Sequence, residues 1–199
     1  MFEQRIQQQF IDSADLKYQW AQSLARPAAE AAQALLACVT GGGKVLACGN
    51  GASGALAQYL AALMIGGVER PRPELPALAL GTDAATLTAV ARRGEWADAF
   101  AAQVRALGSS GDALLILSSN GNAVNLVRAA QAAHEREMSV IALTGRGGGE
   151  LGRLLRETDV HVCVPHERTS RIHEAHQLVL HCLCDCLDQQ LLGEEESSA

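Results

Sequence analysis

The chain has 199 residues, which is the size of one domain and enough to bury a continuous hydrophobic core. Its composition, 48% hydrophobic and 19% charged with only 4% aromatic residues, excludes a disordered chain and indicates a core of Ala, Leu and Val. A net charge of −6 without any run of Lys or Arg argues against direct binding to nucleic acid.

No targeting or membrane segment is apparent in the sequence. The first twenty residues are polar and lack the apolar stretch of a signal peptide. No segment reaches the roughly 18 consecutive apolar residues of a membrane span. We therefore expect a cytoplasmic protein that does not contact a membrane.

The N-terminal region shows two helical patterns, over about 2–25 and 28–40, with Pro27 between them. They predict an N-terminal helical hairpin. The apolar residues of the first pattern recur every four to five positions and form a stripe: Phe2, Ile6, Phe10, Ile11, Leu16 and Trp20. This stripe needs a partner surface on the same molecule or on another subunit, and we expect a homotetramer that uses it together with the last helix.

Five short apolar runs follow and are typical of buried strands: Lys44–Cys48, Ala77–Leu80, Ala113–Leu117, Ser139–Leu143 and Val160–Val164. Helical patterns alternate with them or follow them: Ala52–Ile65, Asp83–Ala91, Glu95–Leu107, Ala123–Glu135, Glu150–Leu155 and Arg168–Leu192. The alternation predicts an α/β fold, a three-layer α/β/α arrangement around a five-stranded parallel sheet.

The whole chain, 1–199, is expected to form a single domain. Its parts are the N-terminal helices (1–40), the α/β core (41–167), the C-terminal helix (168–192) and a solvated acidic tail (193–199).

Two Gly-rich loops each follow a predicted strand and precede a predicted helix. Such loops present backbone N–H groups and the positive end of a helix dipole, which favour a phosphate. The alternative is that they are only tight turns capped by Ser and Asn. The candidate phosphosugar-binding residues are Asn50, Gly51, Ala52, Ser53, Ser118, Ser119, Asn120, Gly121 and Asn122.

The last predicted helix carries several potential metal ligands. His173, His176 and His181 share it, but adjacent helical histidines are at least as often surface or interface residues. Cys182 and Cys186 stand four residues apart without a second Cys pair, which favours core packing. We expect no cofactor and no metal here, with His173 and His181 as the only candidates for one.

Three segments, "GGGKVLACGNGAS", "GDALLILSSNGNAVNLVRAAQAAHEREMSVIALTGRGGGEL" and "VPHERTSRIHEAHQLVLHCLCDCLDQ", resemble the sugar isomerase (SIS) domain. The resemblance covers nearly the whole chain and points to the phosphoheptose isomerase subgroup. That subgroup contains tetrameric isomerases of sedoheptulose phosphate and the DiaA proteins, which bind the replication initiator DnaA. The segments "QVRALG", "GGELGRLL" and "HCLCDCLD" look closer to DiaA.

The resemblance also implies a catalytic and metal site that is altered in this chain. The family places a His and a Glu on the helix after the first loop and a Gln and a His on the last helix, where zinc assists proton transfer. These positions here are Tyr59, Leu63, His173 and His181. A phenol is a poor zinc ligand and Leu is none, so the resemblance implies that the catalytic Glu is lost.

Other family positions in the ligand pocket also differ. The Asn-Asp pair reads Arg92-Arg93, a Ser reads Ala123, and an Asp reads Ser170. The two arginines could attract a phosphate or form an exposed face.

The favoured prediction is therefore a non-catalytic, DiaA-like tetramer that binds DnaA through Leu191 and Leu192 at the end of the last helix. The alternative for these two residues is that they close the tetramer core. The alternative functions are a phosphoheptose isomerase with a divergent site, in which His181 would be the catalytic acid, and a phosphosugar-sensing regulator.

Overall fold

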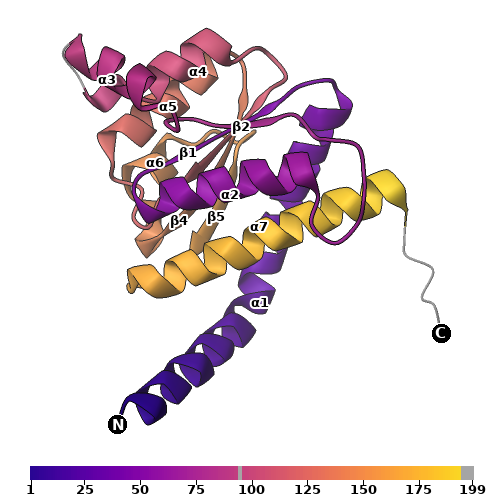
Figure 1. Cartoon of the computed structure of the whole chain (residues 1–199), viewed down its shortest axis with the longest axis vertical. Helices are drawn as coiled ribbons and strands as arrows, with labels where there is room; N and C mark the ends of the chain where they lie inside the picture. The colour runs from indigo at the N-terminus through magenta and orange to yellow at the C-terminus, as the bar shows by residue number, and fades with distance from the viewer. Residues whose placement is uncertain (94–95, 194–199) are drawn as a thin grey trace.

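The computed structural model describes residues 1–93 and 96–193. It contains a five-stranded, all-parallel sheet of strand order β2-β1-β3-β4-β5 (Figure 1). The strands are β1 (Val45–Gly49), β2 (Ala77–Ala79), β3 (Ala113–Leu117), β4 (Ser139–Gly145) and β5 (Val160–Val164). The helices are α1 (Phe2–Thr40), α2 (Ala52–Gly66), α3 (Ala84–Arg92), α4 (Ala101–Leu107), α5 (Val124–Glu135), α6 (Gly149–Leu154) and α7 (Thr169–Leu192), with the short 3-10 turns η1 (Trp96–Asp98) and η2 (Arg146–Gly148). The predicted fold class is confirmed.

The sheet is covered on both faces, as its apolar strands predict. All five residues of β1 and of β3 are buried. Successive strand residues enter opposite cores because side chains alternate across a sheet. Leu115 and Leu117 pack with α1, α2 and α7, whereas Leu114 and Ile116 pack with α4, α5 and α6. The molecule therefore has three layers, with α2 and α7 side by side on one face (Figure 1).

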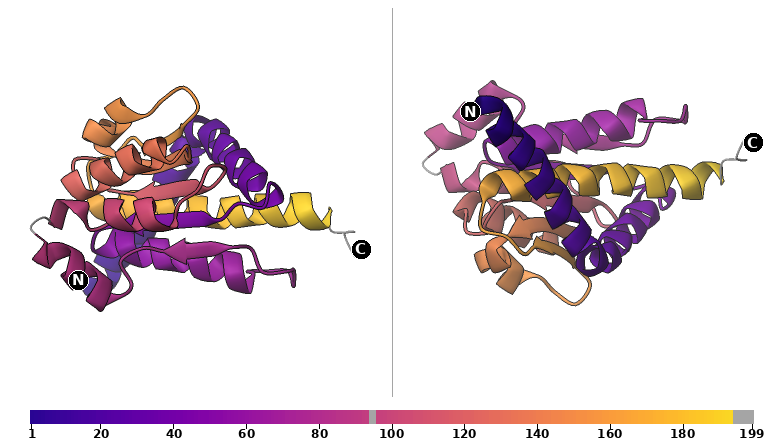
Figure 2. Two further views of the ribbon diagram at one scale, coloured as in Figure 1. Left: turned by 90° about the horizontal axis from the view of Figure 1, so that it is seen from above. Right: turned by 90° about the horizontal axis from the view of Figure 1, so that it is seen from below.

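The N-terminal region differs from the predicted hairpin, because Phe2–Thr40 is one helix with Pro27 inside it. Proline removes a backbone donor and clashes with the preceding turn, which kinks a helix without necessarily ending it. Figure 2 shows that the two halves of α1 run in different directions. Packing on both sides of Pro27 maintains the helix: Trp20 contacts the start of α7, and Leu35 lies in the main core.

The first turns of α1 project beyond the α/β body and leave most of the predicted apolar stripe in solvent (Figure 1). Phe2 is 77% exposed and Phe10 is 76% exposed, whereas Trp20 is buried. A polar network holds this half of α1 against α7. The buried Arg171 donates to Gln9 and to the Glu174 carboxylate, which also accepts a 2.7 Å hydrogen bond from Ser13.

The extended segment between α2 and β2 is held by a buried ion pair. The Arg72 side chain is fully buried and pairs with Asp188 of α7. Its guanidinium also donates to the carbonyl oxygens of Leu63, at 3.0 Å, and Met64, at 2.7 Å. These carbonyls lie in the last turn of α2 and also accept hydrogen bonds from Gly67 N and Leu75 N, at 2.9 and 3.0 Å. Arg72 thus joins the end of α2 to α7.

Two predicted boundaries fall partly outside the described residues. Glu95, the expected first residue of one helix, lies outside the described residues. The expected acidic tail, 193–199, also lies outside them, except for Gly193. Within the part of the chain that is described, 3-10 turn η1 and the shorter α4 replace that helix. No helix in the same part is both long and apolar enough to span a bilayer.

Candidate functional site

The two Gly-rich loops lie next to each other at the carboxyl edge of the sheet. They follow β1 and β3, which are paired strands whose last residues, Gly49 and Leu117, are in register. The chain winds from β1 to β2 in one direction and from β3 to β5 in the other, so the loops flank the switch point of the topology. Ligands of open α/β sheets bind in the crevice at this place.

A reciprocal pair of amides joins the loops. Asn50, in the first loop, and Asn125, in the first turn of α5, exchange two hydrogen bonds of 2.9 Å through their side chains. Asn125 is buried. It was not among the predicted site residues, although it follows the second Gly-rich loop by only three positions. The Asn50 side chain therefore holds the two loops together, within the group of residues predicted to bind a phosphosugar.

Most polar groups of the second loop also brace it internally. Ser118 Oγ accepts a hydrogen bond from Gly121 N at 3.0 Å, and Asn120 Oδ1 accepts one from Asn122 N at 3.0 Å. Asn122 Oδ1 accepts one from Glu150 N at 3.1 Å, which ties the loop to α6. The Ser119 hydroxyl differs from these groups, because it has no hydrogen-bond partner in the part of the chain that the structure describes.

The two helices that leave these loops begin without side-chain caps. The N-cap residue of α2 is Gly51 and that of α5 is Ala123, and neither offers a side-chain acceptor to the first turn. Gly51 and Ala52 are exposed. Uncapped first-turn N–H groups and the helix dipole together form a ready site for an anion. Backbone N–H groups and the Ser119 hydroxyl are therefore the donors that this place offers to an anion.

A line of polar side chains runs from these loops along the seam between α2 and α7. The buried Ser53 Oγ lies 3.2 Å from His173 Nε2. Further along, Tyr59 Oη lies 2.8 Å from His181 Nε2, and the two rings meet edge to face with centroids 5.6 Å apart. Tyr59 is six residues beyond Ser53, or about 9 Å along a helix axis. The structure thus places Tyr59 as the partner of His181.

Tyr59 and His181 open onto a cavity of about 400 Å³. Its remaining lining residues are Val68, Glu69, Arg70, Cys182, Asp185 and Asp188. This volume lies within the range of about 300–1,000 Å³ that is usual for small-molecule sites. Charged groups of both signs, Glu69, Arg70, Asp185 and Asp188, lie in its wall beside apolar surface, and such groups can hold the hydroxyls of a ligand.

The three histidines of α7 do not converge on one point. His173 contacts Ser53, His181 contacts Tyr59, and His176 Nε2 lies 3.0 Å from the Thr144 carbonyl oxygen. Within residues 1–93 and 96–193, no cluster of three or more His, Cys, Asp or Glu side chains could hold a metal ion.

His176 is the most buried of these histidines. Burial lowers its pKa to about 4, and its Nδ1 has no partner in the described part of the chain. The ring is therefore neutral near pH 7 and belongs to the core beneath α7. Burial also lowers the pKa of the half-buried His173.

This burial predicts an acid-sensitive step in stability. Unfolding returns the pKa of His176 from about 4 to 6.5, so the unfolded chain binds the proton more tightly. The neutral His176 ring contributes its full stabilisation above pH 6.5. As the pH falls from 6.5 toward 4, the free energy of unfolding decreases by about 3 kcal/mol. We expect urea unfolding between pH 7 and 4 to show this loss in the unmodified chain and a smaller loss in His176→Gln. Equal losses would contradict it.

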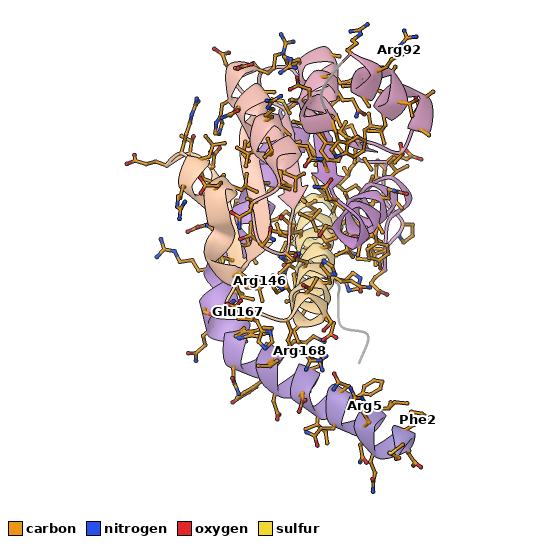
Figure 3. All side chains as sticks on the ribbon, turned by 90° about the vertical axis from the view of Figure 1, so that its left-hand side faces the viewer. Phe2, Arg5, Arg92, Arg146, Glu167 and Arg168 are labelled. Atoms are coloured by element: carbon orange, nitrogen blue, oxygen red, sulfur yellow. The ribbon has the colours of Figure 1, made fainter. Side chains whose placement is uncertain are left out.

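The remaining predicted residues lie apart from this seam. Arg92 and Arg93 are exposed at the end of α3, and Figure 3 shows Arg92 at the opposite end of the molecule from Phe2. Cys182 is exposed and Cys186 is half-buried against the main core, so the expected core packing holds for Cys186 but not for Cys182. Leu191 and Leu192 lie in the last turn of α7 and are 39% and 37% exposed.

Comparison with known proteins gives consistent matches over the whole chain. A family model described as SIS domain matches residues 9–145. The chain is 57% identical over 196 residues to a phosphoheptose isomerase of Methylibium petroleiphilum, covering 98% of each chain. The structure of a phosphoheptose isomerase from Neisseria gonorrhoeae superimposes with a TM-score of 0.89 at 45% identity, covering 95% of this chain and 100% of that one. One from Francisella tularensis gives a TM-score of 0.90 at 41% identity, covering 95% and 99%.

These relatives contradict the predicted function, a non-catalytic DiaA-like protein that binds DnaA. They are named phosphoheptose isomerases, and they match this chain across almost its entire length. The segments that suggested DiaA contain core residues, since Val104, Leu151, Leu183 and Cys184 are all buried. Such residues reflect how the fold packs and do not separate one function from another.

Proposed function

Since the chain belongs to the SIS domain family, we propose that it is a phosphoheptose isomerase, which interconverts sedoheptulose 7-phosphate and an aldoheptose phosphate. The observation that carries the proposal is the pair of helix N-termini without side-chain caps at the switch point, together with a hydrogen-bonded Tyr and His about 9 Å further along α2 that line a cavity. The 57% identity to a protein of that name supports the choice of substrate.

The site can be divided between the two ends of such a substrate. The phosphate would bind the first turns of α2 and α5 and the Ser119 hydroxyl. An extended seven-carbon sugar bound there would reach along the seam toward Tyr59 and His181, about 9 Å further along α2. This arrangement separates anchoring by the phosphate from chemistry at the carbonyl end.

The reaction moves one proton between neighbouring carbons. A base removes a proton from C1 of the ketose, an enediol forms, and the proton is returned at C2 while a second proton moves between the two oxygens. In the proposal His181 Nε2 exchanges the carbon-bound proton, and Tyr59 Oη exchanges protons with His181 and the substrate oxygens. These groups are 2.8 Å apart, which is within reach for proton transfer.

The reaction is expected to be slow, because Leu63 occupies the position at which the family has a catalytic Glu. A positioned general base contributes about 10²–10⁴-fold to a rate. Detection therefore requires a sensitive assay: high protein concentration, sedoheptulose 7-phosphate in D₂O, and NMR observation of deuterium at C1 and of the aldose product.

We expect exchange and product formation with the unmodified protein, and loss of both with His181→Gln. His161→Gln provides a matched control, since His161 is also half-buried but contacts Thr144 on the other side of the sheet. Binding of the sugar phosphate without any exchange or product would contradict the proposed function.

We also propose that the protein assembles as a homotetramer through the first half of α1. The projecting turns expose Phe2, Ile6 and Phe10 beyond the α/β body, as Figure 3 shows for Phe2. In a symmetric oligomer, the same face of a second copy would cover these exposed apolar residues. Light scattering is expected to give four times the 20.9 kDa chain mass, and a monomer mass at micromolar concentration would contradict it.

A further inference from the structure

The position at which the family holds zinc can be tested against the side chains of this chain. Two of its residues, Tyr59 and Leu63, lie one turn apart on α2, and the other two, His173 and His181, lie on α7. A zinc site draws three or four donors from thiolate, imidazole and carboxylate groups at about 2.0–2.3 Å. Only the two histidines belong to these classes.

Leu63 removes one donor and also fills space. Its side chain is buried and belongs to the apolar core that includes Leu60 and Met64. The backbone of the same residue is fixed as well, because its carbonyl accepts from Arg72. A rotation of this turn could not bring another donor into the place of Leu63 without breaking the buried Arg72 contacts.

Tyr59 affects the position in a second way, through His181. The Tyr59 hydroxyl lies 2.8 Å from His181 Nε2, the ring nitrogen that points to α2. A metal ion at that nitrogen would have to replace this hydrogen bond and displace a ring packed edge to face on the imidazole. Phenol oxygen does not compensate, because it is a poor zinc ligand in its protonated form.

His173 cannot make up the deficit. It occupies the position of the family's Gln, so the four positions together supply only two donors of the usual classes, its own imidazole and that of His181. Its Nε2 lies 3.2 Å from Ser53 Oγ, near the loops. The two imidazoles are therefore held by separate partners at separate places on the seam.

We infer that Tyr59 and Leu63 close the family's zinc position in this chain, and that the Tyr59–His181 pair occupies it as a metal-independent proton-transfer pair. The part about proton transfer rests on the proposed isomerase function, whereas the part about zinc does not. The mismatch lies in the donor set: apart from His173 and His181, the family positions provide one phenol and one aliphatic side chain.

The test measures zinc directly. Untagged protein is stripped with a chelator, incubated with one equivalent of zinc chloride, desalted and analysed for zinc by mass spectrometry. We expect far less than one zinc per chain for the unmodified protein and close to one for Tyr59→His/Leu63→Glu, which restores an imidazole and a carboxylate one turn apart. The matched control, Tyr59→Phe/Leu63→Met, changes the same positions without adding donors and is expected to remain free of zinc.

Because a buried Glu can destabilise the fold, Tyr59→His alone provides a second arm. In competition with a zinc-binding dye it is expected to bind zinc more than about tenfold tighter than the unmodified chain, since even outer-shell changes alter metal affinity about 10–100-fold. One zinc per unmodified chain, or no gain in a folded variant that carries the new donors, would overturn the inference.

The two proposals fail in different ways. Zinc content is measured without substrate. A protein that binds no zinc and shows no exchange at C1 would contradict the isomerase function and the proton-transfer role that rests on it, whereas the closed zinc position would stand. If exchange at C1 occurs and is abolished by a chelator, the function stands and the metal-independent pair is wrong. Exchange that persists in chelator and decreases in Tyr59→Phe is the expected result.

Discussion

Replacing Gly121 with alanine is expected to destabilise the protein by roughly 3 kcal/mol and to abolish the binding of sugar phosphates. Gly121 has φ +67°, and a Cβ there would lie well under 3.0 Å from the Gly148 carbonyl oxygen. The left-handed conformation costs an alanine about 1 kcal/mol. The clash adds about 1–3 kcal/mol, because backbone atoms on both sides must move.

The expected effect on binding follows from what this glycine holds together. The Gly121 amide donates to Ser118 Oγ, and its carbonyl accepts from Leu151 N at 2.9 Å. Moving Gly121 away from Gly148 breaks one or both bonds and shifts the start of α5, whose first-turn N–H groups are proposed to bind the phosphate. Urea unfolding and a thermal-shift titration with sedoheptulose 7-phosphate measure the two effects.

Gly111→Ala separates backbone strain from the clash. Gly111 has φ +87°, but no atom lies within 4 Å of the place where its Cβ would stand. Its turn precedes β3 at the opposite edge of the sheet from the loops. We expect a loss of about 1 kcal/mol and unchanged binding. Equal losses in the two alanine variants would show that the contact with Gly148 has no energetic importance.

The parts of this molecule that were predictable from sequence are those fixed by local patterns. Apolar runs such as Ala113–Leu117 are buried on both faces, and the Gly-rich loops end neighbouring strands. Glycine and small polar residues determine where such a loop lies, because backbone conformation is a local property.

The side-chain pairs of the site were not predictable, because each joins segments that are distant in sequence. Asn50 and Asn125 are 75 residues apart, and Tyr59 and His181 are 122 residues apart. No periodicity or motif reports such a pair. The loop residue Asn50 was predictable from its local motif, whereas its partner Asn125 was not.

The N-terminal helix shows how tertiary packing can override a local signal. Pro27 predicted a break, but Ala31 and Leu35 beyond it are buried in the core and Trp20 before it is buried against α7. Burial on both sides stabilises a helix that accommodates one lost hydrogen bond by bending.

The ion pair between Arg72 and Asp188 leads to the second large prediction: Asp188→Ala is expected to destabilise the protein by about 3–5 kcal/mol. The exposed fractions of the two side chains are 0% and 6%. Removing the carboxylate leaves a buried guanidinium whose remaining partners are neutral carbonyls, among them those of Leu63 and Met64. The end of α2 is then no longer tied to α7.

Two comparisons at equal protein concentration, by urea unfolding at pH 7, test this explanation. Glu30→Ala breaks the exposed Arg26–Glu30 pair of α1, 2.9 Å long, and is expected to cost no more than about 1 kcal/mol. Arg72→Met/Asp188→Leu removes both buried charges and should recover part of the loss, because an apolar pair carries no desolvation penalty. Recovery should be incomplete, since the Leu63 and Met64 carbonyls lose the hydrogen bonds from Arg72 and keep those from Gly67 N and Leu75 N. If Asp188→Ala is as mild as Glu30→Ala, the end of α2 is held by its apolar contacts and the buried ion pair is not what joins it to α7.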